Sequence, residues 1–164
     1  MPDTKSTTST VWRHPIHLLA FGLGAGLMPV APGTFGTLVA LPLYFYMQSL
    51  TSVWYLLCVA ALFVAGIALC AKTARDLQAP DHPGIVWDEI VGYLVSMFMA
   101  PTGWRWMFLG FVLFRLFDIW KPFPIRWLDR NVHGGLGIML DDVAAGVAAA
   151  LVLQGVYWIW TLNF

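Results

Sequence analysis

The stretch VWYLLCVAALFVAGIALCA, from Val53 to Ala71, contains nineteen residues and no charge. About twenty apolar residues are needed for a helix to cross the hydrocarbon layer of a membrane. The stretch lies inside a longer run, Leu18 to Ala71, in which 54 residues include no Asp, Glu, Lys, Arg or His. This part of the sequence therefore predicts a membrane-spanning helix and leaves room for further membrane elements before it.

The composition of the whole chain agrees with that prediction. Of the 164 residues, 59% are hydrophobic and only 11% are charged, whereas about 25% charged residues is usual in a soluble domain. Nine basic and nine acidic side chains give a formal charge of zero, so no basic surface is available for nucleic acid. We expect an all-α, polytopic membrane bundle with no nucleic-acid partner.

Further spans are expected on both sides of the first one. Upstream, Ile16 to Met28 is apolar but short, and a Gly/Pro-rich loop separates it from a second apolar piece, Thr37 to Leu50. This pattern predicts a broken or re-entrant element, which a membrane tolerates only where protein or a polar cavity receives the backbone polar groups. Downstream, we expect spans over Ile90–Ala100, Trp104–Phe117 and Val143–Trp160. The total is about four to five membrane helices.

The polar start of the chain and the distribution of charge predict its orientation. Residues 1–12 lack the apolar core of a signal peptide and are expected to form a disordered cytosolic tail, so that residues 13–164 make a single membrane-embedded domain. With the N-terminus inside, eight of the nine basic residues face the cytoplasm and only Arg105 faces outward. The protein is therefore predicted to be a multi-pass membrane protein with its chemistry on the cytoplasmic face.

Two pairs of acids are the first candidates for that chemistry. Asp88-Glu89 and Asp141-Asp142 each come where a predicted span begins, and Asp118 follows a third span. Carboxylate pairs that face one another would form an oxygen-ligand site suited to Mg²⁺. The alternative is that each pair only complements a helix dipole.

Basic side chains near the third span are candidates for phosphate binding. Arg115 is three residues before Asp118, so both lie on one face of a helix. Pro122 and Pro124 are expected to end this helix and to present Lys121 and Arg126 on an extended or turned segment. Arg and Lys both bind phosphate. The alternative is a basic loop that binds anionic lipid headgroups.

The Gly/Pro-rich loop Pro29–Thr37 is a weaker candidate for anion binding. Glycines let backbone N–H groups approach an anion, and a helix that starts near Thr37 would direct its positive end at one. The alternative is helix packing, which the pattern Gly22-x-x-x-Gly26 also favours.

Histidines could serve as proton donors or acceptors. His133 precedes Asp141 by eight residues and is a candidate acid or base, although a loop histidine is often only a surface group. His82 is a weaker candidate of the same kind. For His14 and His17, an interfacial position is expected.

Four ordered motifs resemble the phosphatidylglycerophosphatase A family. They are GLGAGLMPVAPGTFGT at 22–37, IVWDE at 85–89, RLFDIWKPFPIR at 115–126 and DRNVHGGLGIMLDD at 129–142, and the likeness extends from about Trp12 to Tyr157. The resemblance implies a Mg²⁺-dependent lipid phosphatase of the bacterial inner membrane. Its reaction would convert phosphatidylglycerophosphate to phosphatidylglycerol and inorganic phosphate during phospholipid synthesis.

The resemblance also implies roles for particular residues. The metal candidates are Asp88, Glu89, Asp141 and Asp142, with Asp118 beside them. The phosphate candidates are Arg115, Lys121 and Arg126, with the backbone at Gly33 and Thr34. The catalytic candidates are Asp118, His133, Asp141 and Asp142. We hypothesise in-line attack by an activated water that a carboxylate or His133 orients, and a phospho-aspartyl intermediate remains open.

Two other classes of protein could use the same residues. A divalent-cation transporter would bind metal through the carboxylates, but it would need acids near the middle of the bilayer, where the predicted spans have none. A lipid-binding assembly protein would use the charged loops without catalysing a reaction. The oligomeric state is not predicted.

Overall fold

A computed structural model of the chain describes residues 4–80 and 82–163 and is all-helical over those ranges. The elements, in chain order, are α1 (Thr4–Arg13), α2 (Pro15–Ala20), the 3₁₀ helix η1 (Gly22–Leu27), α3 (Pro32–Met47), α4 (Ser52–Asp76), α5 (Trp87–Ser96), α6 (Trp104–Trp120), α7 (Ile125–Asn131) and α8 (Gly134–Asn163). The expected all-α class is confirmed.

Two of these helices, α4 and α8, are long and apolar enough to cross a membrane. The predicted span Val53–Ala71 lies inside α4, and the predicted span Val143–Trp160 lies inside α8. Much of α4 is not covered by protein: Trp54 is 62% exposed and Val64 is 66% exposed. A contiguous apolar surface of this kind is typical of contact with lipid or a partner.

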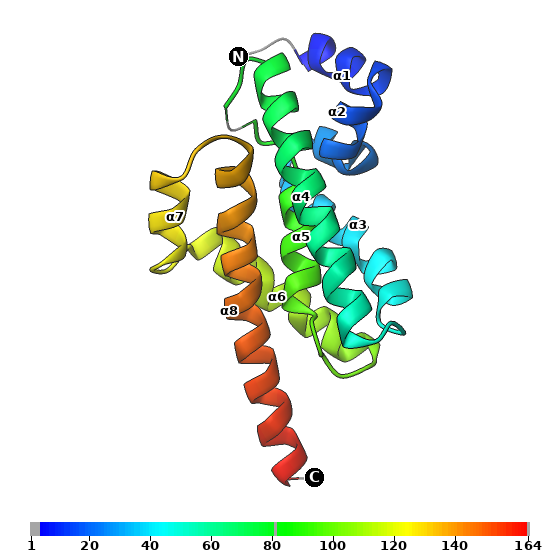
Figure 1. Cartoon of the computed structure of the whole chain (residues 1–164), viewed down its shortest axis with the longest axis vertical. Coiled ribbons are helices and arrows are strands. Elements are labelled where there is room, and N and C mark those ends of the chain that lie inside the picture. The colour runs from blue at the N-terminus through cyan, green and yellow to red at the C-terminus, as the bar shows by residue number, and fades with distance from the viewer. Residues whose placement is uncertain (1–3, 81, 164) are drawn as a thin grey trace.

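Helix α8 is the central element of the bundle. It packs against α4, α5, α6 and α7, and its contact with α5 is the most extensive. Figure 1 shows α4 and α8 running in opposite directions along the length of the molecule, with the C-terminus at one end. The core between these helices is large and apolar, and it includes the fully buried side chains of Tyr93, Phe114, Met139 and Leu153. This core fixes the relative positions of the charged residues at the ends of the helices.

The N-terminal half is broken into short elements, as the glycines and prolines predict. Three successive residues, Gly22, Leu23 and Gly24, have positive φ angles and interrupt the helical path. A Cβ atom at Gly26 would lie 1.9 Å from the carbonyl oxygen of Gly84. The Gly22-x-x-x-Gly26 pattern therefore serves close packing, but its partner is the loop before α5, not a second helix.

Two expectations for this half differ from the structure. Helix α3 begins at Pro32, five residues before the predicted start near Thr37, because proline is well suited to the first turn of a helix. Residues 4–12 form most of α1, where a disordered tail was expected. Val11 in α1 is fully buried, so packing against the rest of the protein outweighs the low helix propensity of the Ser/Thr-rich sequence. Residues 1–3 lie outside the described residues.

Of the two histidines expected at the membrane interface, His14 and His17, His17 lies elsewhere. His17 is 2% exposed, and its Nδ1 is 3.0 Å from the Thr73 hydroxyl. Its Nε2 is 3.2 Å from Asp76 Oδ2. His17 therefore connects α2 to the end of α4 and is not a residue of the surface, whereas His14 is exposed.

Helix α5 is too short to cross a membrane by itself. Its ten residues correspond to about 15 Å, half the thickness of the hydrocarbon layer. The backbone that follows is supported by α8, because the Gln154 amide donates hydrogen bonds to the carbonyl oxygens of Phe98 at 3.1 Å and Met99 at 2.9 Å. Gln154 therefore satisfies backbone groups that a lipid could not.

Helix α6 ends as the two prolines predict. Its last residue is Trp120, and Lys121 follows with a left-handed backbone, φ 46° and ψ 61°. The segment after Pro124 is not extended, however, because Ile125–Asn131 form the short helix α7. The turn brings Lys121 back toward the start of α8.

Candidate active site

The site is built where α5 crosses α8 at two glycines. A Cβ atom on Gly146 would lie 2.3 Å from the Gly92 carbonyl oxygen, and one on Gly92 would lie 2.8 Å from the carbonyl oxygen of Asp142. Glu89 lies three residues before Gly92, and Asp142 lies four residues before Gly146, so each acid shares a helix face with a contact glycine. The absence of side chains at the crossing therefore lets the two acid pairs approach each other.

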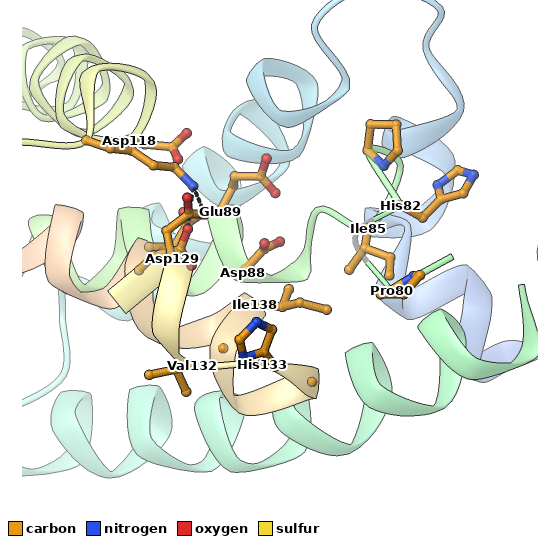
Figure 2. Close-up of a pocket in the computed structure, with 16 residues that line it drawn as sticks. Pro80, His82, Ile85, Asp88, Glu89, Asp118, Asp129, Val132, His133 and Ile138 are labelled. Atoms are coloured by element: carbon orange, nitrogen blue, oxygen red, sulfur yellow. Dashed lines mark hydrogen bonds and ion pairs between the residues drawn. The ribbon is translucent and has the colours of Figure 1, made fainter. Parts of the chain in front are cut away.

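A cavity of about 430 Å³ lies beside this crossing. Its lining includes most of the residues predicted from the sequence, namely Asp88, Glu89, Asp118, Lys121, His133, Asp141 and Asp142. In Figure 2, Asp88, Glu89 and Asp118 gather on one side of the cavity and His133 lies across from them. Residues from four separate parts of the chain thus meet at a single site.

Three carboxylates form the densest part of the site. One oxygen from each of Asp88, Glu89 and Asp142 lies within 4.8 Å of the other two. Asp88 Oδ1, Glu89 Oε2 and Asp142 Oδ2 are buried, and the described part of the chain offers them no hydrogen-bond partner. Buried acceptors without donors are costly, and a cation that binds several carboxylate oxygens would remove that cost. The three residues therefore fit a hard divalent cation such as Mg²⁺.

The pKa values of Asp88 and Glu89, at the start of α5, agree with the close approach of the three carboxylates. Burial raises the pKa of Asp88 well above its usual value, and the nearby carboxylates of Glu89 and Asp142 raise it further. Burial likewise raises the pKa of Glu89. Both shifts have the same main cause, the removal of a carboxylate from water.

The helix-dipole alternative explains only one of the two pairs. Asp88 and Glu89 lie in the first turn of α5, where acids do complement the dipole. Helix α8 begins at Gly134, so Asp141 and Asp142 lie two turns inside it and its first turn contains no acid. The alternative that Asp141 and Asp142 complement the dipole at a helix start is therefore wrong, because the glycine-rich sequence before them is already helical.

Asp141 has a different partner from Asp142. Lys121 Nζ lies 2.6 Å from Asp141 Oδ2 and 2.7 Å from Asp129 Oδ1. Burial acts to lower the pKa of Lys121, but hydrogen bonds to these two carboxylates outweigh it and raise the pKa above its usual value. Lys121 is therefore a fixed positive charge at the edge of the cavity, and Asp141 lies outside the cluster of three carboxylates.

Arg115 lies behind the carboxylate cluster. Its Nη1 is 2.6 Å from Asp118 Oδ2 and 3.7 Å from Glu89 Oε1, which confirms that Arg115 and Asp118 share a helix face. Gly33 at the start of α3 packs against the same groups, since a Cβ atom there would lie 2.0 Å from Glu89 Oε1. The start of α3 and Arg115 together hold the Glu89 carboxylate in place.

Of the five predicted phosphate ligands, Lys121 lines the cavity, whereas Gly33, Thr34, Arg115 and Arg126 do not. The Thr34 N–H donates to the carbonyl oxygen of Ala31, 2.9 Å away, within the first turn of α3. Arg126 lies on α7 in a neighbouring groove, where its Nη2 is 3.3 Å from the Trp120 carbonyl oxygen. His82, the weaker histidine candidate, does line the cavity, and burial lowers its pKa. Its neighbour Asp81 lies outside the described residues.

The sequence interpretation missed two residues that the structure makes important. Asp129 lines the cavity and binds Lys121. The sequence offered a signal for this residue, because Asp129 is a single acid within the basic segment from Lys121 to Arg130. Gln154 supports the backbone after α5. The signal there is a single amide within the apolar stretch Val143–Trp160.

Comparison with known proteins agrees with this geometry. The family model described as Phosphatidylglycerophosphatase A matches residues 18–157. A protein named phosphatidylglycerophosphatase A from Escherichia coli (strain K12) is 48% identical over 151 residues, which cover 92% of this chain and 88% of the relative. One of the same name from Haemophilus influenzae (strain ATCC 51907 / DSM 11121 / KW20 / Rd) is 46% identical over 148 residues, covering 88% of this chain and 91% of the relative.

A more distant relative has a different name. It comes from Bacteroides thetaiotaomicron (strain ATCC 29148 / DSM 2079 / JCM 5827 / CCUG 10774 / NCTC 10582 / VPI-5482 / E50) and is provisionally named a phosphatidylinositol-3-phosphatase. It is 34% identical over 149 residues, which cover 87% of this chain and 93% of the relative. No solved structure matches the chain. Since the family match covers every element from α3 to α7 and most of α8, the chain belongs to the phosphatidylglycerophosphatase A family.

Proposed function

We propose that this protein hydrolyses the terminal phosphomonoester of phosphatidylglycerophosphate, producing phosphatidylglycerol and inorganic phosphate for phospholipid synthesis. Membership of the family and the names of the relatives that are 48% and 46% identical support this substrate. The observation that carries the proposal is the cavity itself, in which buried carboxylates without hydrogen-bond donors lie beside a fixed lysine. Carboxylates that hold a divalent cation, beside a lysine that pairs with phosphate oxygens, are typical of phosphoryl-transfer sites.

In this proposal Asp88, Glu89 and Asp142 hold Mg²⁺. Their orphaned oxygens and their mutual distances fit an oxygen-ligand site. When bound, Mg²⁺ would neutralise charge on the phosphate and lower the pKa of a water molecule. Arg115 does not compete with this role, because its charge supports Glu89 and Asp118 from outside the cavity.

The remaining side chains bind the phosphate and move protons. Lys121 faces the cavity and can pair with phosphate oxygens as their charge increases. A water attacks phosphorus in line with the glycerol oxygen, so that a new P–O bond forms while the bond to glycerol breaks. His133, or a carboxylate of the cavity, accepts the proton of the water, and the leaving oxygen takes up a proton to become the glycerol hydroxyl.

We further propose that the protein is a multi-pass protein of the bacterial inner membrane with this cavity on the cytoplasmic side. Two candidate spans and the exposed apolar surface of α4 support membrane insertion. The shorter helices α3 and α6, and α5 together with the segment after it that Gln154 supports, complete a bundle of about four to five membrane helices, with the broken segment α2–η1 as a re-entrant element. The excess of basic residues at the end of the molecule that bears the cavity supports the orientation.

The experiment is phosphate release by the purified full-length protein in mixed micelles. The substrates are phosphatidylglycerophosphate and phosphatidic acid, each with Mg²⁺ and with a chelator. We expect metal-dependent release that favours phosphatidylglycerophosphate. Equal release with the chelator would contradict the metal assignment while leaving the phosphatase activity intact.

The absence of phosphate release, together with measurements of lipid binding and Mg²⁺ uptake, would identify the other two classes of protein. A lipid-binding assembly protein would bind the lipid without releasing phosphate. A divalent-cation transporter would release none and would move Mg²⁺ into proteoliposomes. Phosphatidylinositol 3-phosphate is a further substrate to include, because one relative is provisionally named a phosphatidylinositol-3-phosphatase.

A further inference from the structure

A second concave surface adjoins the catalytic cavity and has a different character. This surface, here called the arginine groove, has a volume of about 440 Å³ and is lined by residues of the α6–α7 turn and α7, among them Trp120, Lys121, Phe123, Arg126, Trp127 and Arg130. Three of its lining residues are cations and none is an acid. The charged side chains of the groove are therefore basic, whereas those of the catalytic cavity are mostly carboxylates.

The two arginines of the groove form no ion pair with an acid of the described residues, although Arg126 Nη2 donates to the Trp120 carbonyl oxygen. Within residues 4–80 and 82–163, neither Arg126 nor Arg130 has a carboxylate within 4.0 Å, unlike Lys121 and Arg115 of the active site. Both side chains are exposed, and they lie four residues apart on one short helix, so they share a face. A guanidinium pair of this kind suits the oxygens of a phosphate.

The arginine groove and the catalytic cavity are joined through Lys121, which lines both. Its Nζ is held at the boundary by Asp129 and Asp141. A molecule with two phosphates could therefore place one in the cavity and the other in the groove, with Lys121 between them.

The substrate of the proposed function is such a molecule. A three-carbon glycerol joins its terminal phosphomonoester to a phosphodiester, and the diester is attached to the part that carries the acyl chains. Trp120, Phe123 and Trp127, which are 63%, 85% and 55% exposed, border the groove. Exposed aromatic side chains beside cations are typical of the membrane interface, where the diester of a lipid lies.

We propose that Arg126 and Arg130 form a separate subsite that binds the phosphodiester of the lipid substrate while the monoester occupies the catalytic cavity. The subsite rests on the proposed function and adds to it a basis for specificity. Phosphatidic acid has a single phosphate, attached directly to the acyl-bearing glycerol, so it cannot fill both places. The arginine groove therefore favours lipids whose headgroup carries a diester and a monoester together.

The test compares the variants Arg126→Gln, Arg130→Gln and the double variant with wild type, using full-length protein in neutral detergent micelles with Mg²⁺. The control is Arg105→Gln, because Arg105 is also an exposed cation but lies at the opposite end of α6. We expect the double variant to lose about tenfold or more in kcat/KM for phosphatidylglycerophosphate, mostly through KM. The control variant should keep its wild-type value.

Product inhibition isolates the groove from the cavity. Phosphatidylglycerol, the lipid product, has the diester alone, and inorganic phosphate is the other product, which leaves the catalytic cavity. The double variant should lose inhibition by phosphatidylglycerol and keep inhibition by inorganic phosphate. The conservative variant Arg126→Lys/Arg130→Lys should recover part of the lost kcat/KM, which a role in folding would not predict for side chains so exposed.

Two results would overturn the subsite. One is an unchanged KM for phosphatidylglycerophosphate in the double variant. The other is an equal loss of inhibition by phosphatidylglycerol and by inorganic phosphate, which would place both arginines in the cavity chemistry. If wild type releases no phosphate from phosphatidylglycerophosphate, the proposed function itself fails, and that outcome is distinct from either result.

Discussion

Asp142 is the acid whose surroundings most clearly require a cation. It is 2% exposed, and its Oδ2 has no hydrogen-bond partner in the described part of the chain. We expect Asp142→Asn, which keeps the shape and removes the charge, to lower kcat by about 100-fold or more because a ligand for the metal is lost. Phosphate release measures the effect, and membrane insertion should be unchanged.

A matched control for this variant is Asp76→Asn. Asp76 is an aspartate that already has partners, Lys72 at 2.8 Å and His17 at 3.2 Å, and it lies at the end of α4 and does not line the cavity. Its variant should retain activity. Full activity in Asp142→Asn would remove that carboxylate from the site.

Gly33 is the second residue at which a small change should affect the chemistry. The methyl group of Gly33→Ala would overlap Glu89 Oε1, the end of a flexible side chain, so Glu89 must move while the backbone stays in place. We expect a loss of activity of about tenfold or more, with little change in thermal unfolding. Gly155→Ala is the control, because a Cβ atom at Gly155 meets nothing within 4 Å. Equal activity in both variants would show that the position of Glu89 does not matter.

At the scale of elements, the support of α5 by α8 gives a result that hydropathy alone would not predict. Gln154→Leu makes α8 more apolar, but it removes the donor for the carbonyl oxygens of Phe98 and Met99. We expect a loss of about 1–3 kcal/mol in stability, since an unmet polar group is costly away from water. Thermal unfolding in detergent measures it.

The comparison for that measurement is Gln48→Leu. The Gln48 side chain donates to the carbonyl oxygen of Phe45, three residues earlier in the chain, in an exposed position, so its replacement should change the unfolding temperature little. A Gln154→Leu protein as stable as wild type would show that water or detergent serves these carbonyl groups equally well.

The elements that the sequence predicts well are those defined by long-range composition. The charge-free run predicts α4, and Pro122 with Pro124 predicts the end of α6. The early part of α8 could not be predicted, because Gly134 to Gly137 are typical of a loop. In the folded protein a Cβ at Gly135 would lie 2.1 Å from the Ile67 carbonyl oxygen, so these glycines allow α8 to pack on α4, which only the tertiary structure reveals.

For the candidate site, too, the sequence predicts some features, and others depend on the tertiary structure. The sequence identifies the acids and cations because ionisable residues are rare in an apolar chain. It does not reveal that Lys121 pairs with Asp141, or that Arg126 lies in a separate groove. Both depend on how α7 folds back toward α8, and that geometry has no signature in spacing.

At the scale of the whole molecule, charge predicts which end faces the cytoplasm. We expect Lys72→Cys to be protected from an impermeant thiol reagent in intact cells, and Thr102→Cys to react. Lys72 lies near the end of α4 and Thr102 lies between α5 and α6, and both are exposed. The native Cys58 and Cys70 must first be replaced by alanine. The reverse pattern of labelling would invert the proposed orientation.

The aromatic border of the arginine groove has a kinetic consequence. With Phe123 and its neighbouring tryptophans inserted at the interface, the proposed enzyme meets its substrate by lateral diffusion within the lipid layer. Its velocity then follows the mole fraction of substrate in that layer, and not the amount in the suspension. Dilution of the surface with inert detergent therefore slows turnover even when the bulk concentration of substrate is constant.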